Sequence, residues 1–316
     1  MKIVPFDIEK HSKEWDDFIA ACPMATFLHS RKFLSYHKDK FQDCSLMMYG
    51  DEGLEAVLPA ALDPKDAKRV VSHPGITYGG LLTQGIKGGN EIRELFTAIF
   101  GYYQSAGKKQ FVYKAIPSFY HRAPSETDEW VLTALGARIV RTDLSRVINL
   151  KQDFIWGDPR RRGVTKSKKA GIELAQGQKF ADSLWAVTQD NLARKHAVVP
   201  VHSLDDIHVL VDTFPSEIDY IVALLEGKVV AGAMLFITPS VVHVQYGSSS
   251  EKGYETGALE TVYYRAIEWA KEQGKDYFSF GISTEQEGKV LNETLDMFKK
   301  KFSAGGAVYR FYALEL

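Results

Sequence analysis

The sequence is poor in cysteine and has no excess charge of either sign. Its 316 residues include two cysteines, Cys22 and Cys44, and neither belongs to a CxxC motif or a Cys/His cluster. This argues against a zinc site and against a disulfide framework, and it is typical of a reducing compartment. The 39 basic and 40 acidic residues leave a formal net charge of -1. General binding of nucleic acid through excess positive charge is therefore disfavoured.

Long apolar runs and heptad repeats are also missing. The longest apolar run, residues 229–237, is too short to cross a bilayer as a helix. The first 17 residues, MKIVPFDIEKHSKEWDD, are too charged for a signal peptide. We therefore expect a cytoplasmic protein without a membrane span, whose length and 45% hydrophobic content can build two domains.

One order of elements occurs twice along the chain. The second half predicts a helix after the capping signature at Ser203, a hairpin around Gly227, a strand at 241–247, a long helix ending at Gly274, then a strand, a helix and a closing strand. The first half repeats this order with a hairpin around Gly53 and a long helix ending at Gly107. Many α/β domains alternate their elements in a similar way, but agreement over so many elements favours a duplication. Gly157 and Pro159 mark the break, which predicts domains at 1–152 and 153–316.

Three segments carry a resemblance to a known family. They are RRRGVTKSKKAGIEL at 160–174, the ending from DYFSFGIS to YALEL at 276–316, and TFLHSRKFLSYH at 26–37. Together with the repeated order, they resemble the Fem-type transferases, whose halves have the fold of GNAT acyl-CoA N-acyltransferases. The resemblance implies a mixed α/β fold of two tandem GNAT-like domains and acyl or aminoacyl transfer to an amine.

The same resemblance suggests partners. The coiled-coil arm of the larger Fem proteins is missing, which disfavours transfer RNA as a partner. The chain is more similar to the shorter bacterial relatives linked to envelope polysaccharide or lipid modification. A small molecule, a sugar or a glycan precursor is thus the expected acceptor. A noncatalytic ligand-binding protein on a decayed fold is the other alternative.

GNAT enzymes hold the CoA diphosphate in a glycine-rich loop before the long helix. The corresponding residues here suggest Gly253, Gly257 and Ala258 as the cofactor-binding positions, with acyl-CoA, for example acetyl-CoA, as co-substrate. Glu251 and Glu255 bring negative charge to the same place. No bound prosthetic group and no metal are expected.

Candidate catalytic residues lie on the strand at 241–247. No Ser-His-Asp or Cys-His arrangement is visible, which favours direct transfer in a ternary complex. An imidazole with an ordinary pKa near ~6.5 is suited to general-base catalysis, so His243 is the candidate base, and Tyr246 is a second candidate. Strand alternation predicts that Gln245 shares the face of His243 and contacts substrate. The alternative is a histidine that only bonds a neighbouring strand.

A second group of candidates follows the strand ending at residue 282. Ligands often bind beyond the carboxyl ends of strands, so Ser283, Glu285 and Asn292 are candidates, with Glu285 as a base or sugar ligand. Capping of the next helix is the alternative for Asn292. The resemblance implies an anion-binding role for Lys299, and a solvated lysine-rich face is its alternative.

The remaining substrate-binding candidates are scattered. Arg161 and Lys168 of the basic stretch are suited to a phosphate-bearing acceptor, unless that stretch is only a solvated connection. The motif HPGITYGG contributes His73 and Tyr78, where glycines allow close approach of a ligand or else mark a bulged strand. The other candidates are Tyr120, His121 and His196.

Overall fold

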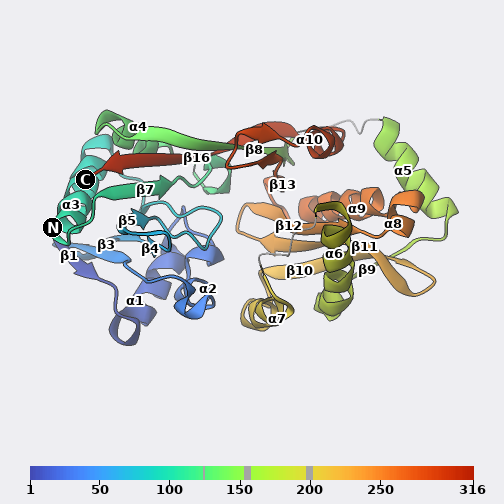
Figure 1. The fold of residues 1–316 in the computed structure, drawn as a ribbon, viewed down its shortest axis with the longest axis horizontal. Helices are drawn as coiled ribbons and strands as arrows, with labels where there is room; N and C mark the ends of the chain where they lie inside the picture. Colours follow the sequence, from blue (N-terminus) through green and yellow to red (C-terminus); the bar gives the residue numbers. More distant parts are fainter. Residues whose placement is uncertain (124, 153–157, 197–201) are drawn as a thin grey trace. The chain divides into compact units, whose positions relative to one another are not determined.

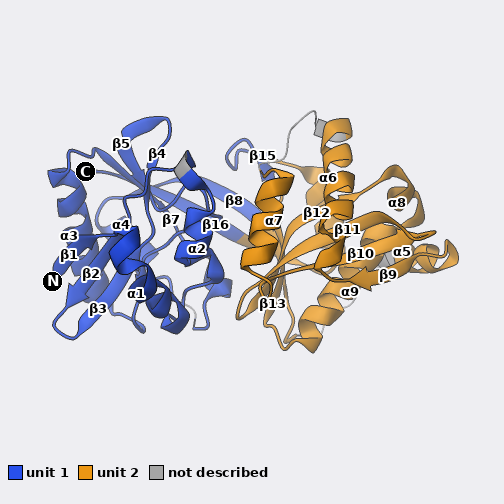
Figure 2. Ribbon diagram, turned by 90° about the horizontal axis from the view of Figure 1, so that it is seen from below, with its two compact units in different colours: residues 1–144, 284–290, 308–316 blue, residues 145–283, 291–307 orange. Residues whose placement is uncertain are grey.

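A computed structural model describes residues 1–123, 125–152, 158–196 and 202–316, and only the backbone at 39, 158–161, 195 and 196. The chain divides into two compact units (Figure 2). Unit 1 comprises Met1–Leu144, Thr284–Val290 and Val308–Leu316, and unit 2 comprises Ser145–Ser283 and Leu291–Ala307. In the described ranges, no helix combines the length and apolarity needed to cross a membrane.

The units interleave along the chain more than the sequence predicted. A simple division after residue 152 leaves 284–290 and 308–316 in the second half, whereas both segments belong to unit 1. Two long strands contribute residues to both units, β8 (Arg138–Asn149) and β16 (Gly305–Glu315). The pairing partners of a strand come from tertiary structure, so a sequence pattern cannot reveal such an exchange.

Unit 1 contains helices and strands from both ends of the chain (Figure 1). Its helices are α1 (Ile8–Ala21), α2 (Arg31–Ser35), α3 (Gly89–Ser105) and α4 (Thr127–Ala134), with 3-10 turns at Phe27–His29, Lys38–Lys40 and Ser118–Tyr120. Its strands are β1 (Lys2–Pro5), β2 (Leu46–Gly50), β3 (Gly53–Leu58), β4 (Ala61–Asp63), β5 (Asp66–Val71), β6 (Leu82–Thr83) and β7 (Gln110–Lys114), with parts of β8 and β16.

These strands form two sheet segments, ordered β1-β2-β3-β6 and β4-β5-β7-β16-β8. α3 buries apolar residues at helical spacing, including Leu95, Phe96 and Ile99, in a core shared with Phe111 and Tyr113 of β7. Each such aliphatic or aromatic side chain contributes about 1.5–3 kcal/mol by leaving water. The residues that alternate with these core positions on β7, Gln110, Val112 and Lys114, point to the opposite face of the sheet.

Unit 2 has the segment order β8-β13-β12-β11-β10-β9. Its strands are β9 (Glu173–Gln176), β10 (Ile218–Leu225), β11 (Lys228–Ile237), β12 (Val241–Ser249) and β13 (Tyr277–Ile282). Its helices are α5 (Asp158–Lys169), α6 (Ala181–His196), α7 (Leu204–Thr213), α8 (Glu251–Thr256), α9 (Ala258–Glu272) and α10 (Glu293–Lys300), with a 3-10 turn at Gln178–Phe180. The short strands β14 (Thr284–Glu285) and β15 (Val290–Leu291) pair with each other.

α9 covers one face of the unit 2 sheet. Its residues Leu259, Val262 and Ile267 share a core with Val242 and Val244 of β12. The predicted apolar stripe and the end of the helix are confirmed, since Gly274 follows α9 with a φ of 68°. The hairpin turn at Glu226 and Gly227 is likewise confirmed, with φ values of 51° and 75°.

Candidate active site

The parallel strands β12 and β13 of unit 2 stay in register for only three residue pairs. The last pair is His243 with Ser279, although β12 continues to Ser249 and β13 to Ile282. On its other side, β12 remains paired with β11 as far as Ser249. In the part of the chain that the structure describes, the β13-facing side of β12 therefore has no strand partner beyond His243. We call this end of the ladder the fork.

Backbone irregularities flank the fork on both strands. Tyr246 pairs with Met234 and Val244 pairs with Leu235, so Gln245 is an extra residue in β12. The regular alternation that predicted a shared face for His243 and Gln245 is therefore interrupted at Gln245, and His243 shares a face with Tyr246. On β13, Gly281 has a φ of 72°, within a register shift against β8. The backbone must adopt a left-handed conformation there, and glycine adopts that conformation with the least strain.

His243 is buried at the fork and bonded to the neighbouring strand. Its Nδ1 lies 3.1 Å from the Oγ of Ser279. Burial, and secondly the charge of Lys299, lowers the pKa of His243 to about 3. The ordinary value assumed from the sequence does not apply to the folded chain, where the imidazole is neutral at physiological pH.

Lys299 is buried on α10 beside the end of β13. Its Nζ donates to the backbone oxygens of Gly281, at 3.0 Å, and Ile282, at 2.6 Å. Burial lowers the pKa of this ammonium to about 7, against the opposing effect of Asp296. The alternative of a solvated lysine is wrong for Lys299, which is 5% exposed, and holds for its exposed neighbours Lys300 and Lys301.

Asp296 is also buried on α10, where it forms a bidentate pair with Arg146 of β8. The Nε and Nη2 of Arg146 lie 2.7 and 2.6 Å from the two carboxylate oxygens. This pair holds the pKa of Asp296 below its ordinary value. Two buried charged contacts thus anchor α10 next to the fork.

Tyr246 contributes a polar group on the face of His243. Its hydroxyl lies 2.5 Å from Nδ1 of His202, and its ring packs edge-on against Trp185 at 5.3 Å. Burial raises the pKa of Tyr246 to about 12. At neutral pH the phenol is therefore a hydrogen-bonding group and is not ionised.

The candidates that follow β13 separate into different environments. Asn292 caps α10, since its Oδ1 accepts from the N–H of Leu295 at 3.0 Å, which confirms the capping alternative. Ser283 is buried, and its Oγ has no hydrogen-bond partner within the described ranges. Glu285 is exposed on β14 and belongs to unit 1, whereas Ser283 and Asn292 belong to unit 2.

The predicted glycine-rich loop is instead the short helix α8. Ser250 caps it by accepting from the N–H of Gly253 at 3.1 Å. A Cβ on Gly253 would lie 2.4 Å from the backbone oxygen of Val230. Gly257 joins α8 to α9 with a φ of 72°, and a Cβ there would lie 2.7 Å from the backbone oxygen of Gly163 in α5. Close packing accounts for both glycines, and Ala258 is buried.

The basic stretch forms α5, which packs against the start of α9 through Gly163. Lys168 is exposed on this helix, as are Arg162, Lys166 and Lys169. The side chains of Arg161 on α5 and His196 on α6 lie outside the described residues. Their predicted contacts with substrate remain predictions.

The candidates from the first half are buried inside unit 1. The rings of Tyr78 and Tyr120 pack 4.5 Å apart at a tilt of 43°, and the Tyr120 hydroxyl lies 3.1 Å from that of Tyr309. Burial lowers the pKa of His121 to about 4, and neither of its ring nitrogens has a hydrogen-bond partner in the described ranges. His73 is 2% exposed. Packing in the unit 1 interior, where these side chains are inaccessible to solvent, accounts for them without a substrate.

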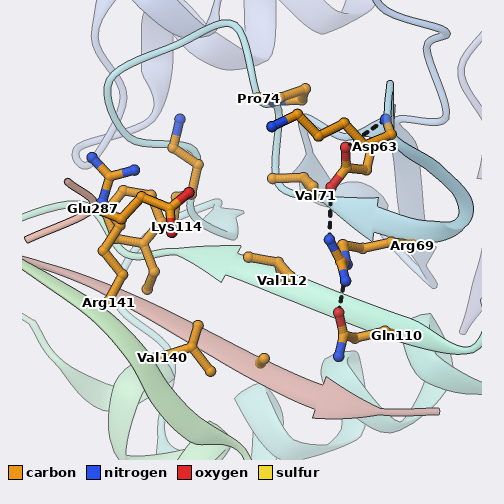
Figure 3. A pocket seen from close by; sticks show the side chains of 13 residues that line it. Asp63, Arg69, Val71, Pro74, Gln110, Val112, Lys114, Val140, Arg141 and Glu287 are labelled. Atoms are coloured by element: carbon orange, nitrogen blue, oxygen red, sulfur yellow. Dashed lines mark hydrogen bonds and ion pairs between the residues drawn. The ribbon is translucent and has the colours of Figure 1, made fainter.

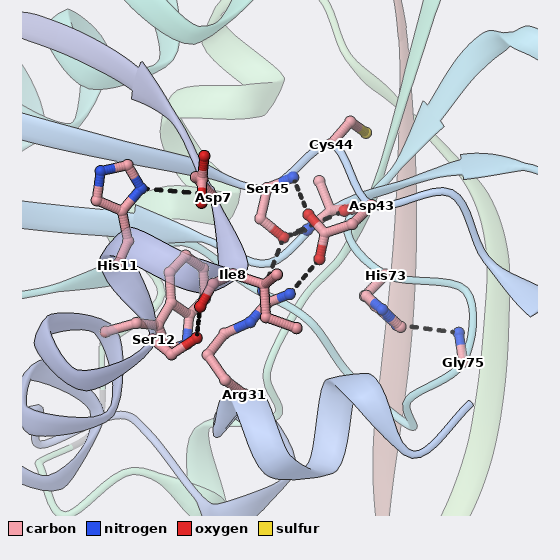
Figure 4. A network of polar contacts seen from close by, with 12 residues as sticks. Asp7, Ile8, His11, Ser12, Arg31, Asp43, Cys44, Ser45, His73 and Gly75 are labelled. Carbon is pink, nitrogen blue, oxygen red and sulfur yellow. Dashed lines mark hydrogen bonds and ion pairs between the residues drawn. The ribbon is translucent and has the colours of Figure 1, made fainter. Parts of the chain in front are cut away.

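Arg31 organises a polar network in unit 1 that the sequence did not suggest (Figure 4). Its guanidinium pairs with Asp43, lies 3.3 Å from the Oγ of Ser45 and stacks over Phe6 at 3.6 Å. Arg31 lies in the segment TFLHSRKFLSYH, where the sequence alone suggests an exposed residue.

The sequence analysis also did not select Ser279 and Gly281 of the fork. The alternation of Phe278 and Phe280 could have indicated Ser279, because it places Ser279 on the opposite face of the strand.

A known protein family matches part of the chain. Residues 159–288 match the family described as "Acetyltransferase (GNAT) domain". This chain therefore contains a GNAT acetyltransferase domain. The match covers less than half of the chain and includes the fork, α8 and α9. No curated protein matches the sequence.

Solved structures extend the likeness to the whole chain. FemX aligns with a TM-score of 0.71 at 10% identity, covering 100% of this chain and 98% of FemX. L-PGS from Bacillus licheniformis aligns at 0.63 and 16% identity, covering 95% and 90% of the two chains. A tandem GNAT protein from the clavulanic acid biosynthesis pathway aligns at 0.58 and 13% identity, covering 99% and 98%. The predicted fold of two tandem GNAT-like halves in mixed α/β sheets is confirmed.

The family match and the fold together make this chain an enzyme of the acyltransferase class. No group of three or more His, Cys, Asp or Glu residues suited to a metal ion occurs among the described residues.

Proposed function

We propose that the chain transfers an acyl or aminoacyl group directly from an activated carrier to the amine of a small-molecule, sugar or envelope-precursor acceptor, with the fork as the reaction site. The unpaired edge of β12 beyond His243 is the observation that supports this most. A free strand edge offers backbone N–H and C=O groups in a row, and an extended donor arm containing amides can pair with them.

The polar groups at the fork suit direct transfer. The acceptor nitrogen attacks the donor carbonyl carbon and forms a C–N bond. The tetrahedral oxyanion then collapses, the C–S or C–O bond to the carrier breaks, and the amine proton passes to the departing heteroatom through solvent. Neutral His243, held by Ser279, can accept a hydrogen bond from the attacking amine.

Lys299 can stabilise the oxyanion. An ammonium has three N–H donors, and the structure shows two of them committed to the oxygens of Gly281 and Ile282. The third remains for a developing negative charge, in a buried setting where electrostatic stabilisation is strong. Because the pKa of Lys299 is about 7, transfer should slow as pH rises through neutrality.

Hydroxylamine as a surrogate acceptor tests this function without knowledge of the natural one. The protein is incubated with acetyl-CoA, longer acyl-CoAs or a mixture of aminoacyl-transfer RNAs, and hydroxamate is measured. We expect one donor class to react, and His243→Gln to lower the rate by about 10²-fold with little loss of stability. Lys299→Arg should move the alkaline decline to higher pH, since a guanidinium stays charged. If no donor is consumed above the enzyme-free rate, the proposal is wrong.

A transfer-RNA-bound donor is a second candidate, supported by the start of α9. That helix end, where GNAT enzymes hold the CoA diphosphate, is packed against Gly163 of α5. The exposed face of α5 carries Arg162, Lys166, Lys168 and Lys169. Bulk transfer RNA should then bind with an affinity that falls steeply with salt, and a K166Q/K168Q/K169Q variant should reduce that slope by about 2–3. Binding that is unchanged in this variant would leave acyl-CoA as the better donor.

A further inference from the structure

A separate cavity of about 650 Å³ lies wholly within unit 1. It opens on the sheet face opposite α3, over β5, β7, β16 and β8. Apolar side chains line part of it, including Val112, Val140 and Phe311. Its volume is in the range of small-molecule sites, and charged groups occur at two ends (Figure 3).

One end of the cavity is internally satisfied. The Nη1 of Arg69 lies 3.0 Å from Asp63, and its Nε lies 2.5 Å from the Oε1 of Gln110. In these contacts, the charges of Asp63 and Arg69 are paired with each other. The end marked by these three residues is therefore a poor place for a ligand's charged group.

The opposite end of the cavity has polar groups that are available to bind a ligand. Lys114, Arg141 and Glu287 lie together there (Figure 3). Arg141 uses its Nε on Asp143 at 2.7 Å and stacks over Phe311 at 4.6 Å. Its two terminal NH2 groups, like the carboxylate of Glu287, have no hydrogen-bond partner among the described residues. Lys114 is already committed to the backbone oxygens of His73 and Ile76.

Glu287 is held at the cavity by a tight turn with an unusual backbone. Gln286, Glu287 and Gly288 have consecutive positive φ values of 49°, 57° and 84°. For a residue other than glycine, this left-handed conformation costs about 1–2 kcal/mol of free energy. A Cβ on Gly288 would lie 2.1 Å from the backbone oxygen of Thr142, and Thr284 donates to Asp143 at 2.9 Å. The turn is thus fixed on β8 in the conformation that carries Glu287, as is common at functional sites.

We propose that this cavity binds the zwitterionic end of an α-amino acid, with its carboxylate on the terminal NH2 groups of Arg141 and its ammonium on Glu287. A purely anionic ligand would be repelled by Glu287, and a purely cationic one by Arg141 and Lys114. The guanidinium presents the paired donors that a carboxylate accepts. The side chain of the ligand would pack on Val112 and Phe311. This site is independent of the proposed function of the fork, so either can fail alone.

Calorimetric titration of the whole chain with matched probes tests the site. Leucine carries both charges, 4-methylpentanoate lacks the ammonium, and 3-methylbutylamine lacks the carboxylate. Nε-acetyl-lysine places the zwitterion at the end of a longer arm, so it reports on an amino acid carried by a larger molecule. We expect leucine or Nε-acetyl-lysine to bind at least about tenfold more tightly than either single-charge probe. If neither zwitterion binds at millimolar concentration, the proposal is wrong.

Variants identify the groups responsible. Glu287→Gln should weaken zwitterion binding about tenfold and leave the affinity for 4-methylpentanoate equal or higher, because only the ammonium loses its partner. Arg141→Lys should weaken both probes by removing the paired donors. Glu52→Gln, in the exposed turn between β2 and β3, is the matched control and should change nothing. Equal weakening by Glu52→Gln and Glu287→Gln, or an unchanged affinity in Glu287→Gln, would overturn the assignment.

Discussion

Each unit contains a parallel strand pair that keeps register for three residue pairs, and the two ladders end differently. In unit 1, β5 and β7 pair from Arg69 with Gln110 to Val71 with Val112. Residues 72–80 then fold back over the end of this ladder, where the N–H of Gly79 donates to the oxygen of Lys114 at 3.0 Å. In unit 2, β12 simply continues as a strand for six residues past its last pair with β13.

Each of the two ladder ends has its own buried lysine beside it. Lys114 donates to two oxygens of the segment 72–80, and Lys299 donates to two oxygens at the end of β13. Burial lowers the pKa of each to about 7. The chain's own segment occupies the ladder end in unit 1, whereas the edge of β12 is left for a ligand in our proposal. The same local construction thus serves packing in one unit and, we propose, chemistry in the other.

The largest expected effect comes from disturbing the segment 72–80. A Cβ on Gly79 would lie 1.9 Å from the backbone oxygen of Ser72, so Gly79→Ala must shift the backbone. We expect a loss of about 3 kcal/mol or more in the free energy of unfolding, measured with urea. Gly101→Ala in α3 is the control, since nothing lies within 4 Å of its Cβ, and it should be stabilising by about 0.5–1 kcal/mol. A neutral Gly79→Ala would mean that this segment is not packed as described.

Removing the lysine of unit 1 should have the next largest effect. Lys114→Met leaves the oxygens of His73 and Ile76 without their buried donor. We expect a loss of about 2–3 kcal/mol in urea unfolding. Lys108→Met removes a similar bond to the oxygen of Ala67 at the surface, and it should cost less than about 0.5 kcal/mol. Equal costs for the two variants would contradict the clamping role of Lys114.

Acid should destabilise unit 1 before unit 2. Burial lowers the pKa of His29 and His121 in unit 1 to about 4, and it also lowers that of His73 well below its ordinary value. These imidazoles are neutral when folded, and the unfolded chain binds protons first as the pH falls below ~6.5. Their neutral burial therefore costs nothing above that pH. For His29 and His121, stability is lost between pH ~6.5 and 4, by about 2 kcal/mol for each of the two at pH ~4.5.

Hydrogen exchange resolved by unit would measure this difference, because these three histidines lie in unit 1, whereas His243, whose pKa burial lowers to about 3, lies in unit 2. His121→Gln should reduce the acid sensitivity of unit 1. His208→Gln, which removes a surface histidine whose pKa is raised by Asp182, should not reduce it. Simultaneous opening of both units at the same pH would contradict the expectation.

The smallest change in stability is expected at the fork of unit 2, from a substitution at Gly281. Gly281→Ala introduces a Cβ 3.5 Å from His243, which is an ordinary contact, so only the backbone conformation is strained. We expect a loss of about 1 kcal/mol, similar to Gly274→Ala, which has a φ of 68° and open space. Only Gly281→Ala should slow hydroxamate formation. If both variants retain the full rate, the geometry of the fork does not limit transfer.

Sequence reasoning was most successful where local chemistry decides structure. The capping box at Ser203, the glycine after α9 and the turn at Gly227 all lie where expected, because each satisfies backbone groups within a few residues. It failed at α8, where the resemblance to GNAT enzymes suggested a glycine-rich loop. There the glycines allow close packing against Val230 and Gly163, which are distant in sequence.

Tertiary structure also decided the candidate sites. A single extra residue at Gln245 changed which side chains share a face with His243, and a bulge leaves no strong signal in the sequence. Burial of Tyr78, Tyr120 and His121 turned predicted substrate ligands into interior residues. The partners of Lys299 and Arg141 are backbone oxygens and carboxylates that only the fold brings to them.

One sequence was enough to predict an α/β chain of balanced charge whose elements follow the same order twice, and three of its segments resemble Fem-type transferases with GNAT-like halves. Periodicity, caps and turns are local properties, so one chain is sufficient to read them. The folded structure was needed to show where the strand ladders end, which segments fill those ends and which titratable groups are buried. These outcomes depend on contacts between distant residues and on the exclusion of water, and neither is encoded in any short stretch of the chain.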